Sequence, residues 1–343
     1  MSTAAGAMQV KSNGLNHHFC RQGRVRYSMV PEVTFEVLLE DEVTSFASKE
    51  AGLVGNESLL SLANDYEDGE WRYRRFGDFI WDSIKETALS QSERTAWISR
   101  PMTMLRMAAE RLRICDDNGK GSELAEIFLY GVMRRHYDAL PAVPKIFYKQ
   151  NRNDNAKGAD SVHVIVSEGG SFELWLGEAK FYKSISDSDF DTFISSVENT
   201  LDKIAIRKEN SIILGVRDLE ECLKSRYSED RAENIYRDIR RALAPETSVD
   251  GIRRILHIPI LLIDECDITK RSTVFDEEYR NAVKEHHKKR AVDYFKRQVE
   301  RLKDKVHMYS EVRFHLILFP IPNKKRIVDE FLSMASSLRG EIS

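Results

Sequence analysis

The amino-acid sequence predicts an α/β protein with a mixed central sheet flanked by helices. Short apolar runs rich in β-branched residues recur along the chain, and they alternate with longer stretches whose apolar residues have helical spacing. This alternation is typical of domains in which helices cover a sheet. With 343 residues, of which 42% are hydrophobic, the chain is long enough for one large domain or two modest ones with an apolar core.

The N-terminal third is expected to be mostly helical. Residues 1–30 carry basic but no acidic side chains and are interpreted as a flexible leader. A short strand is predicted at 33–39, and a mostly helical stretch over 55–114. We interpret 31–115 as an N-terminal elaboration and assign no function to it.

The remainder, 116–343, is interpreted as a core with C-terminal helices. Its predicted strands are short apolar runs bounded by turn signals such as Ser-Glu-Gly-Gly-Ser at 167–171. The expected strands are 145–150, 160–166, 172–182, 211–216, 255–264 and 313–321. The expected helices are 121–137, 219–227, 233–244, a long charged helix over 276–306, and 324–338.

Composition favours a cytoplasmic protein that is not embedded in a membrane. The four cysteines, Cys20, Cys115, Cys222 and Cys266, are scattered without a CxxC pair, as expected of reduced thiols. No window reaches the ~18 consecutive apolar residues of a membrane span. The net charge of −3 neither indicates nor excludes nucleic-acid binding, since a local basic patch suffices for it.

Three residues indicate a catalytic site: Asp160, Glu178 and Lys180. Glu178 and Lys180 are two apart on a predicted strand, so both side chains leave the same face, although their neighbours are apolar. Asp160 stands at the start of the preceding strand. Carboxylates from separate segments that hold Mg²⁺, or Mn²⁺ in its place, together with a lysine that orients water, are what phosphodiester hydrolysis requires.

A further metal ligand is expected on the helix over 121–137. Glu123 and Glu126 lie three residues apart there, on neighbouring parts of one face. We prefer Glu126, because apolar residues follow it directly, and therefore expect Asp160, Glu178 and Glu126 to bind the metal. Taken singly, these residues have ordinary explanations: a surface ion pair worth ~0–1 kcal/mol, a strand-start aspartate, and a first-turn helix acid. Their joint occurrence favours the catalytic interpretation.

Strand register provides a geometric condition on this site. A hairpin loop of two or four residues would place Asp160 opposite Ala179, facing away from Glu178. An odd loop or a bulge would bring Asp160 onto the face of Glu178 and Lys180. The catalytic interpretation therefore predicts such an irregularity, or an Asp160 just outside the regular ladder.

At these residues the sequence resembles the PD-(D/E)XK nuclease superfamily, with Asp160 followed by Glu178-Ala179-Lys180; Ala159 replaces the usual proline. The segments GSELAEIFLY, KGADSVHVIV and LWLGEAKFY are together similar to the HamA family, the nuclease subunits of the Hachiman anti-phage system. The resemblance implies a bacterial, Mg²⁺-dependent DNase with a restriction-endonuclease-like core over 116–343. It also implies DNA as substrate and a superfamily 2 helicase partner resembling HamB. The sequence contains no GxxxxGK[ST] motif, so an ATP-driven step would come from that partner.

Two other functions remain open from the sequence. One is a catalytically silent module that keeps the nuclease fold to bind DNA or a protein, although such a module has no need of Lys180. The other is a restriction-type endonuclease that acts alone, for which the sequence offers no recognition domain.

Overall fold

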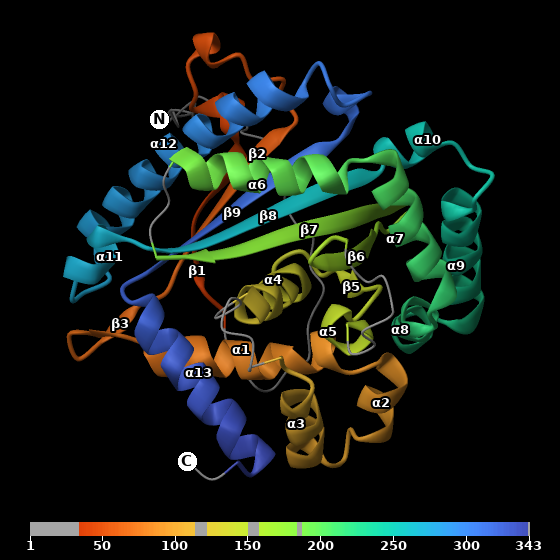
Figure 1. Ribbon diagram of the computed structural model, residues 1–343, viewed down its shortest axis with the longest axis horizontal. Helices are drawn as coiled ribbons and strands as arrows, with labels where there is room; N and C mark the ends of the chain where they lie inside the picture. The colour runs from red at the N-terminus through yellow and green to blue at the C-terminus, as the bar shows by residue number, and fades with distance from the viewer. Residues whose placement is uncertain (1–33, 114–121, 150–157, 184–186, 342–343) are drawn as a thin grey trace, which may run out of the picture. The chain divides into compact units, whose positions relative to one another are not determined.

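The computed structural model describes residues 34–113, 122–149, 158–183 and 187–341. The leader predicted over 1–30 and two of the cysteines, Cys20 and Cys115, lie outside these residues. Figure 1 shows a central sheet with helices on both faces, which confirms the predicted α/β class and the mixed sheet. No helix in the described ranges is long and apolar enough to cross a membrane.

The central sheet has seven strands in the described part of the chain, in the order β1-β2-β9-β8-β7-β6-β5. Its middle strands β2, β9, β8 and β7 run parallel, whereas β1 at one edge and β6 and β5 at the other are antiparallel to their neighbours. The strands are β1 Glu36–Glu42, β2 Glu57–Ala63, β5 Leu140–Pro141, β6 Ser161–Val166, β7 Phe172–Tyr182, β8 Leu256–Glu265 and β9 Arg313–Ile321; a separate small hairpin contains β3 Tyr66–Glu67 and β4 Glu70–Trp71.

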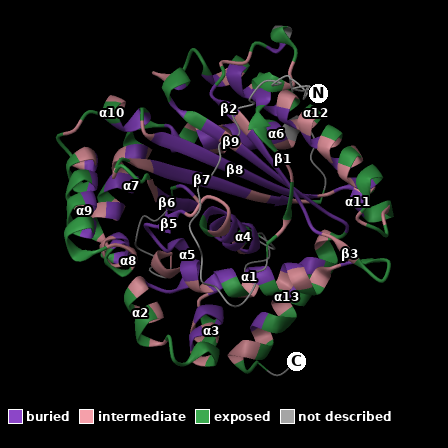
Figure 2. Cartoon of the chain, turned by 180° about the vertical axis from the view of Figure 1, so that it is seen from behind, coloured by how far each residue is buried: buried purple, intermediate pink, exposed green. Residues whose placement is uncertain are grey.

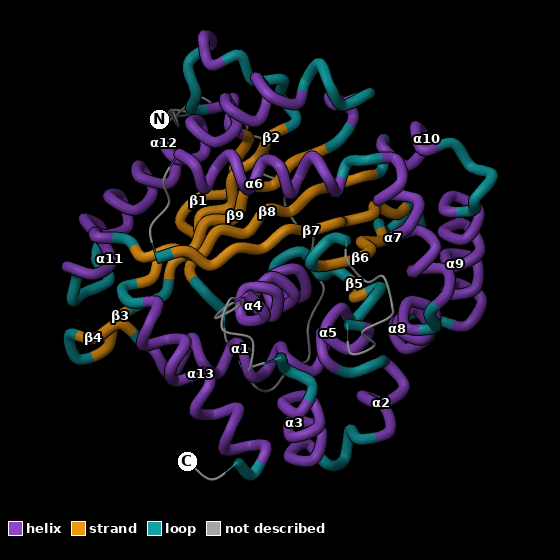
Figure 3. Tube along the Cα trace, viewed as in Figure 1, coloured by secondary structure: helices purple, strands orange, loops and turns teal. Residues whose placement is uncertain are grey.

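Helices cover the two faces of this sheet (Figure 3). The first part of the chain contributes α1 Tyr73–Ala88, α2 Gln91–Ala96, α3 Pro101–Glu110, α4 Ser122–Arg135 and α5 Lys145–Tyr148. The middle contributes α6 Asp187–Thr200, α7 Lys203–Gly215, α8 Asp218–Arg226, α9 Glu229–Leu243 and α10 Val249–Arg253. The C-terminal part contributes α11 Asp267–Arg271, α12 Glu277–Leu302 and α13 Lys324–Arg339.

Alternating residues of β7 belong to two separate apolar cores. Leu174 and Leu176 pack with Phe193 of α6 and Tyr294 of α12. Trp175, Ala179 and Phe181 pack on the opposite face with residues of α1, α4 and α13. This division follows from the two-residue period of a strand. Because β8 and β9 lie in the middle of the sheet, they are buried on both faces (Figure 2), which explains their continuous apolar sequences.

The N-terminal segment is less helical than predicted, because the strand β2 was missed within 55–114. β2 reads Glu-Ser-Leu-Leu-Ser-Leu-Ala and is almost entirely buried between β1 and β9. A short apolar run of this kind has no period that separates a buried strand from a helix. The N-terminal segment therefore contributes two strands to the central sheet in addition to α1, α2 and α3.

Two predicted strands are wrong. The run at 145–150 begins as the one-turn helix α5, which starts directly after Pro144, a residue whose fixed backbone angle suits a helix start. The run at 211–216 ends the helix α7, which begins at Asp202, whose side chain accepts hydrogen bonds from the N–H groups of Ile204 and Ala205. The strands and helices predicted from 255 onward are confirmed, with α12 ending at Leu302 rather than 306.

Candidate active site at the β6–β7 hairpin

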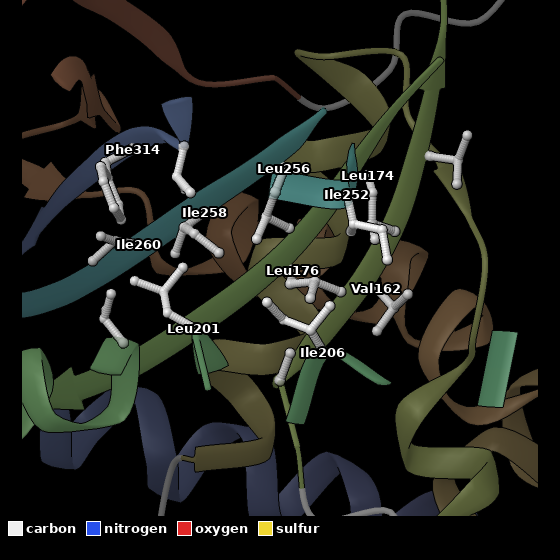
Figure 4. Close-up of a cluster of buried hydrophobic side chains, with 14 of the residues drawn as sticks. Val162, Leu174, Leu176, Leu201, Ile206, Ile252, Leu256, Ile258, Ile260 and Phe314 are labelled. Atoms are coloured by element: carbon white, nitrogen blue, oxygen red, sulfur yellow. The ribbon is translucent and has the colours of Figure 1, made fainter. Parts of the chain in front are cut away.

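Glu178 and Lys180 leave β7 on the face that α6 covers, as their spacing predicts. Apolar side chains surround this part of the sheet, including Leu176 and Ile260 (Figure 4). Glu178 is 5% exposed and Lys180 is half-buried. The Lys180 Nζ lies 3.8 Å from Glu178 Oε2, so the two charges form an ion pair at the edge of the apolar layer.

Asp160 lies next to this pair because the hairpin loop has an odd number of residues. The last ladder pair is Val166↔Phe172, so five residues separate the strands, and Gly170 occupies the left-handed region with a φ of 86°. The first pair is Ser161↔Gly177, and the next position along this register places Asp160 opposite Glu178. The predicted irregularity is thus confirmed, and Asp160 precedes the first residue of β6.

Two groups contact the same oxygen of the Asp160 carboxylate. Its Oδ2 accepts a hydrogen bond of 3.1 Å from the backbone N–H of Ala179. The same oxygen lies 3.6 Å from Lys180 Nζ. Because Lys180 also pairs with Glu178, one ammonium group joins carboxylates from two neighbouring strands.

Helix α4 brings Glu126 to the same region. The helix packs between α1 and β7, and two glycines permit the close approach. A Cβ on Gly177 would lie 2.9 Å from Leu129 Cδ2, and a Cβ on Gly131 would lie 2.6 Å from the Phe79 ring. Glu126 is 6% exposed as a result.

Glu123 has a different surrounding from Glu126. Its Oε2 accepts a hydrogen bond of 2.8 Å from the backbone N–H of Arg113. Burial raises the pKa of Glu123, and the Arg113 N–H and the Lys149 ammonium oppose this. The charge of Glu126 is among the causes that raise the pKa of Glu178. The geometry therefore favours Glu126 over Glu123 as the third carboxylate.

Lys149 contacts a candidate ligand of the site, although the sequence did not indicate it. Its Nζ donates to both Glu126 oxygens at 2.8 Å, and its charge interacts with Asp160. Lys149 directly follows α5, a segment whose sequence pattern predicts a strand. The signal that could have found it is the spacing of Lys145 and Lys149, four residues apart after Pro144, which places both on one side of a helical turn.

The two buried glutamates of the site, Glu178 and Glu126, have raised pKa values. Burial, followed by the charge of Asp160, raises the pKa of Glu178 to about 7, against the opposing Lys180 ammonium and Thr200 hydroxyl. The Thr200 hydroxyl donates to Glu178 Oε1 at 2.7 Å. Burial also raises the pKa of Glu126 to about 7, with Lys149 opposing and Asp160 adding to the shift. Three acids and two lysines from separate segments thus share one largely buried region.

The donor chemistry of this region fits a hard divalent cation, for which carboxylate oxygens are the preferred ligands. In the described ranges, no group of three or more acidic, histidine or cysteine side chains is already spaced to hold a metal ion. Asp160 and Glu178, which both lie within 4 Å of the Lys180 ammonium, could hold such a cation, and Glu126, which Lys149 contacts, is the third carboxylate of the region.

Comparison with known proteins bears on the whole chain. A search of curated proteins returned no match. The family model described as HamA matches residues 37–335, a range that begins at the second residue of the edge strand β1, extends past β9 and includes every candidate site residue. The match covers most of the chain, and the chain therefore belongs to the HamA family.

Proposed function

We propose that this chain is a metal-dependent DNA nuclease, the effector subunit of a Hachiman anti-phage defence complex, controlled by a helicase partner. The observation that carries the proposal is the meeting of Asp160, Glu178 and Lys180 at the open end of the β6–β7 hairpin, with Lys180 Nζ within 4 Å of both carboxylates. Membership of the HamA family supports the defence role. The proposal keeps Mg²⁺, with Mn²⁺ as a substitute, as the cofactor.

The residues of the site divide the work of phosphodiester hydrolysis among them. Asp160 and Glu178 would hold the cation, which when bound acidifies water and neutralises charge on the phosphate. Lys180 is placed to donate a hydrogen bond to the attacking water or to a phosphate oxygen, since its side chain is 30% exposed and its ammonium group lies beside both carboxylates. Thr200 holds Glu178 Oε1 and leaves Oε2 directed toward Lys180.

Lys149 gives this mechanism a second basic group. Its side chain is partly exposed beside Glu126, so once released from that carboxylate it could bind a backbone phosphate of DNA. The helicase partner is proposed as the source of control because a nuclease of this type would otherwise cleave host DNA.

The test is plasmid nicking and linearisation with Mg²⁺ or Mn²⁺, with and without a co-expressed helicase partner. Wild type is compared with Glu178→Ala and Lys180→Ala, and with Glu168→Ala, which changes an exposed acid in the turn of the same hairpin. Cleavage should be lost in the first two variants and retained in the third. Full activity in the Glu178 and Lys180 variants would reject the site. Absence of cleavage under every condition, with DNA or helicase binding retained, would favour the catalytically silent module.

A further inference from the structure

A buried ion pair outside the proposed catalytic group joins α5 to α7. Lys145 Nζ lies 2.8 Å from both carboxylate oxygens of Glu209, and each residue is 1% exposed. Replacing such a pair by apolar residues is often neutral for stability, because desolvation offsets the attraction between the charges. Stability alone therefore does not account for this buried pair.

Glu209 has a second contact, with the chain that leads into Asp160. Its Oε1 accepts a hydrogen bond of 3.1 Å from the backbone N–H of Ala159. The carboxylate also fills the space beside Gly158, where a Cβ would lie 1.9 Å from Glu209 Oε1. Only glycine at this position lets the backbone run this close to the carboxylate.

The contact between Glu209 and Ala159 lies outside the hydrogen-bonded ladder of β6 and β7. The β6–β7 ladder begins at Ser161, so the Ala159 N–H has no partner strand and would otherwise be a buried donor without an acceptor. Asp160 is the next residue, and its carboxylate accepts a hydrogen bond from the N–H of Ala179. Asp160 is thus fixed at two points, by Glu209 through its neighbour and by Ala179 through its own carboxylate.

We propose that Glu209, itself held by Lys145, is a positioning residue that sets the place of Asp160 in the candidate active site. This positioning role rests on the proposed nuclease function, but Glu209 itself would contact neither metal nor substrate. Lys145 holds Glu209 through both oxygens, so the acceptor presented to Ala159 has one orientation. Supporting groups of this kind matter because metal affinity depends on how well the ligand itself is oriented.

The test compares two double variants that both remove the buried charges. Lys145→Met/Glu209→Gln keeps an oxygen acceptor for Ala159, whereas Lys145→Met/Glu209→Leu removes it at similar volume. Ile213→Ala is the control, because Ile213 is a fully buried residue one turn further along α7. Thermal unfolding of all three establishes that each variant is folded before any other measurement.

Two readouts do not depend on DNA cleavage. Hydrogen exchange of the Ala159 and Ala179 amides, followed by NMR, should be about tenfold faster in the Leu variant, as expected for loss of one hydrogen bond. Mn²⁺ affinity measured by calorimetry without DNA should fall about tenfold in the Leu variant. The Gln variant and Ile213→Ala should remain close to wild type in both measurements, and kcat for DNA cleavage should follow the Mn²⁺ affinity.

Three results would overturn the proposal. One is unchanged amide exchange in the Leu variant. Another is an equal loss in the Gln and Leu variants, which would mean that the ion pair and not the acceptor matters. The last is an equal loss in Ile213→Ala, which would reduce Glu209 to general packing. A wild type that binds no metal or cleaves no DNA would reject the proposed function instead, while the exchange measurement would still decide whether Glu209 positions Asp160.

Discussion

Lys149 donates hydrogen bonds to both carboxylate oxygens of Glu126, each at 2.8 Å. The pair joins the residue after α5 to α4, 23 positions earlier in the sequence. It engages the one predicted metal ligand that comes from a helix. The Lys149 ammonium places positive charge in a region with three acids, as a bound cation would.

Lys149→Met should therefore change how much metal the protein requires. At pH 8.5, where Glu126 is ionised, removing the competing ammonium should lower the Mg²⁺ concentration for half-maximal cleavage by about threefold to tenfold. The measurement is initial cleavage rate against Mg²⁺ concentration, supported by Mn²⁺ calorimetry without DNA.

The control for this prediction is Lys224→Met, which removes a lysine from an exposed i,i+4 pair with Glu220 far along the sequence. It should leave the metal requirement unchanged. If Lys149→Met raises the Mg²⁺ requirement at pH 8.5, Lys149 serves substrate binding or the order of the site rather than competing with the metal.

The raised pKa values of Glu126 and Glu178 predict that the metal-free protein becomes less stable as pH increases. Both are raised from 4.5 to about 7, so between these values the folded state holds protons that the unfolded state has released. The stabilisation is complete below the unfolded value and is lost as pH rises through the folded one. In EDTA, the free energy of unfolding should fall by on the order of 1–3 kcal/mol per group between pH 5 and 8.

Urea denaturation of wild type and Glu178→Gln at both pH values measures how much Glu178 contributes to this change in the free energy of unfolding. Relative to wild type, the Gln variant should gain stability at pH 8 and lose this advantage at pH 5. Glu168→Gln, in the exposed turn, should run parallel to wild type throughout. If the free energy of unfolding rises by the same amount between pH 5 and pH 8 in all three proteins, Glu178 is not buried as a protonated acid.

Much of the site followed from sequence because its decisive features are local. Glu178 and Lys180 share a face by the period of a strand, and the odd loop before them settles the position of Asp160. The central strands β8 and β9 and the helix α12 were also predictable, because each is long enough for its pattern to be distinctive.

The features that the sequence does not predict depend on contacts between segments that are far apart in the chain. Lys149 contacts Glu126 and Lys145 contacts Glu209 only after α4, α5 and α7 have packed. The four-residue spacing of the two lysines indicates a shared helical face but does not identify their acidic partners. The short apolar runs of β2 and α7 were ambiguous for a related reason. Which of them enters the sheet is decided by their neighbours and not by their own residues.

The hairpin turn gives a prediction on stability alone. Gly170 has a φ of 86°, so Gly170→Ala places a side chain in a strained conformation and should cost about 1 kcal/mol. Gly169 in the same turn has no such φ, and its added Cβ would meet only Ser167 Oγ at 3.9 Å. Thermal unfolding should therefore show a lower Tm for Gly170→Ala and little change for Gly169→Ala. Equal Tm values in the two variants would contradict the left-handed turn.

Gly177 links the packing of α4 to the chemistry proposed for the site. A Cβ there would meet Ser161 Oγ at 2.3 Å, Leu129 Cδ2 at 2.9 Å and Pro259 Cγ at 3.0 Å. The serine can rotate, but Leu129 and Pro259 are fixed by the core, so Gly177→Ala should push α4 away from β7. Overpacking of this kind costs about 1–3 kcal/mol, and the displaced helix should also weaken Mn²⁺ binding by moving Glu126.

Gly215→Ala provides the matched control, because Gly215 ends α7 with open space beside it. Alanine is the better helix former, so this variant should be as stable as wild type or more so, with unchanged Mn²⁺ affinity. Both variants are measured by urea denaturation and by calorimetry with Mn²⁺. If Gly177→Ala loses stability but binds Mn²⁺ as tightly as wild type, then Glu126 is not a ligand, and Asp160 and Glu178 bind the metal without it.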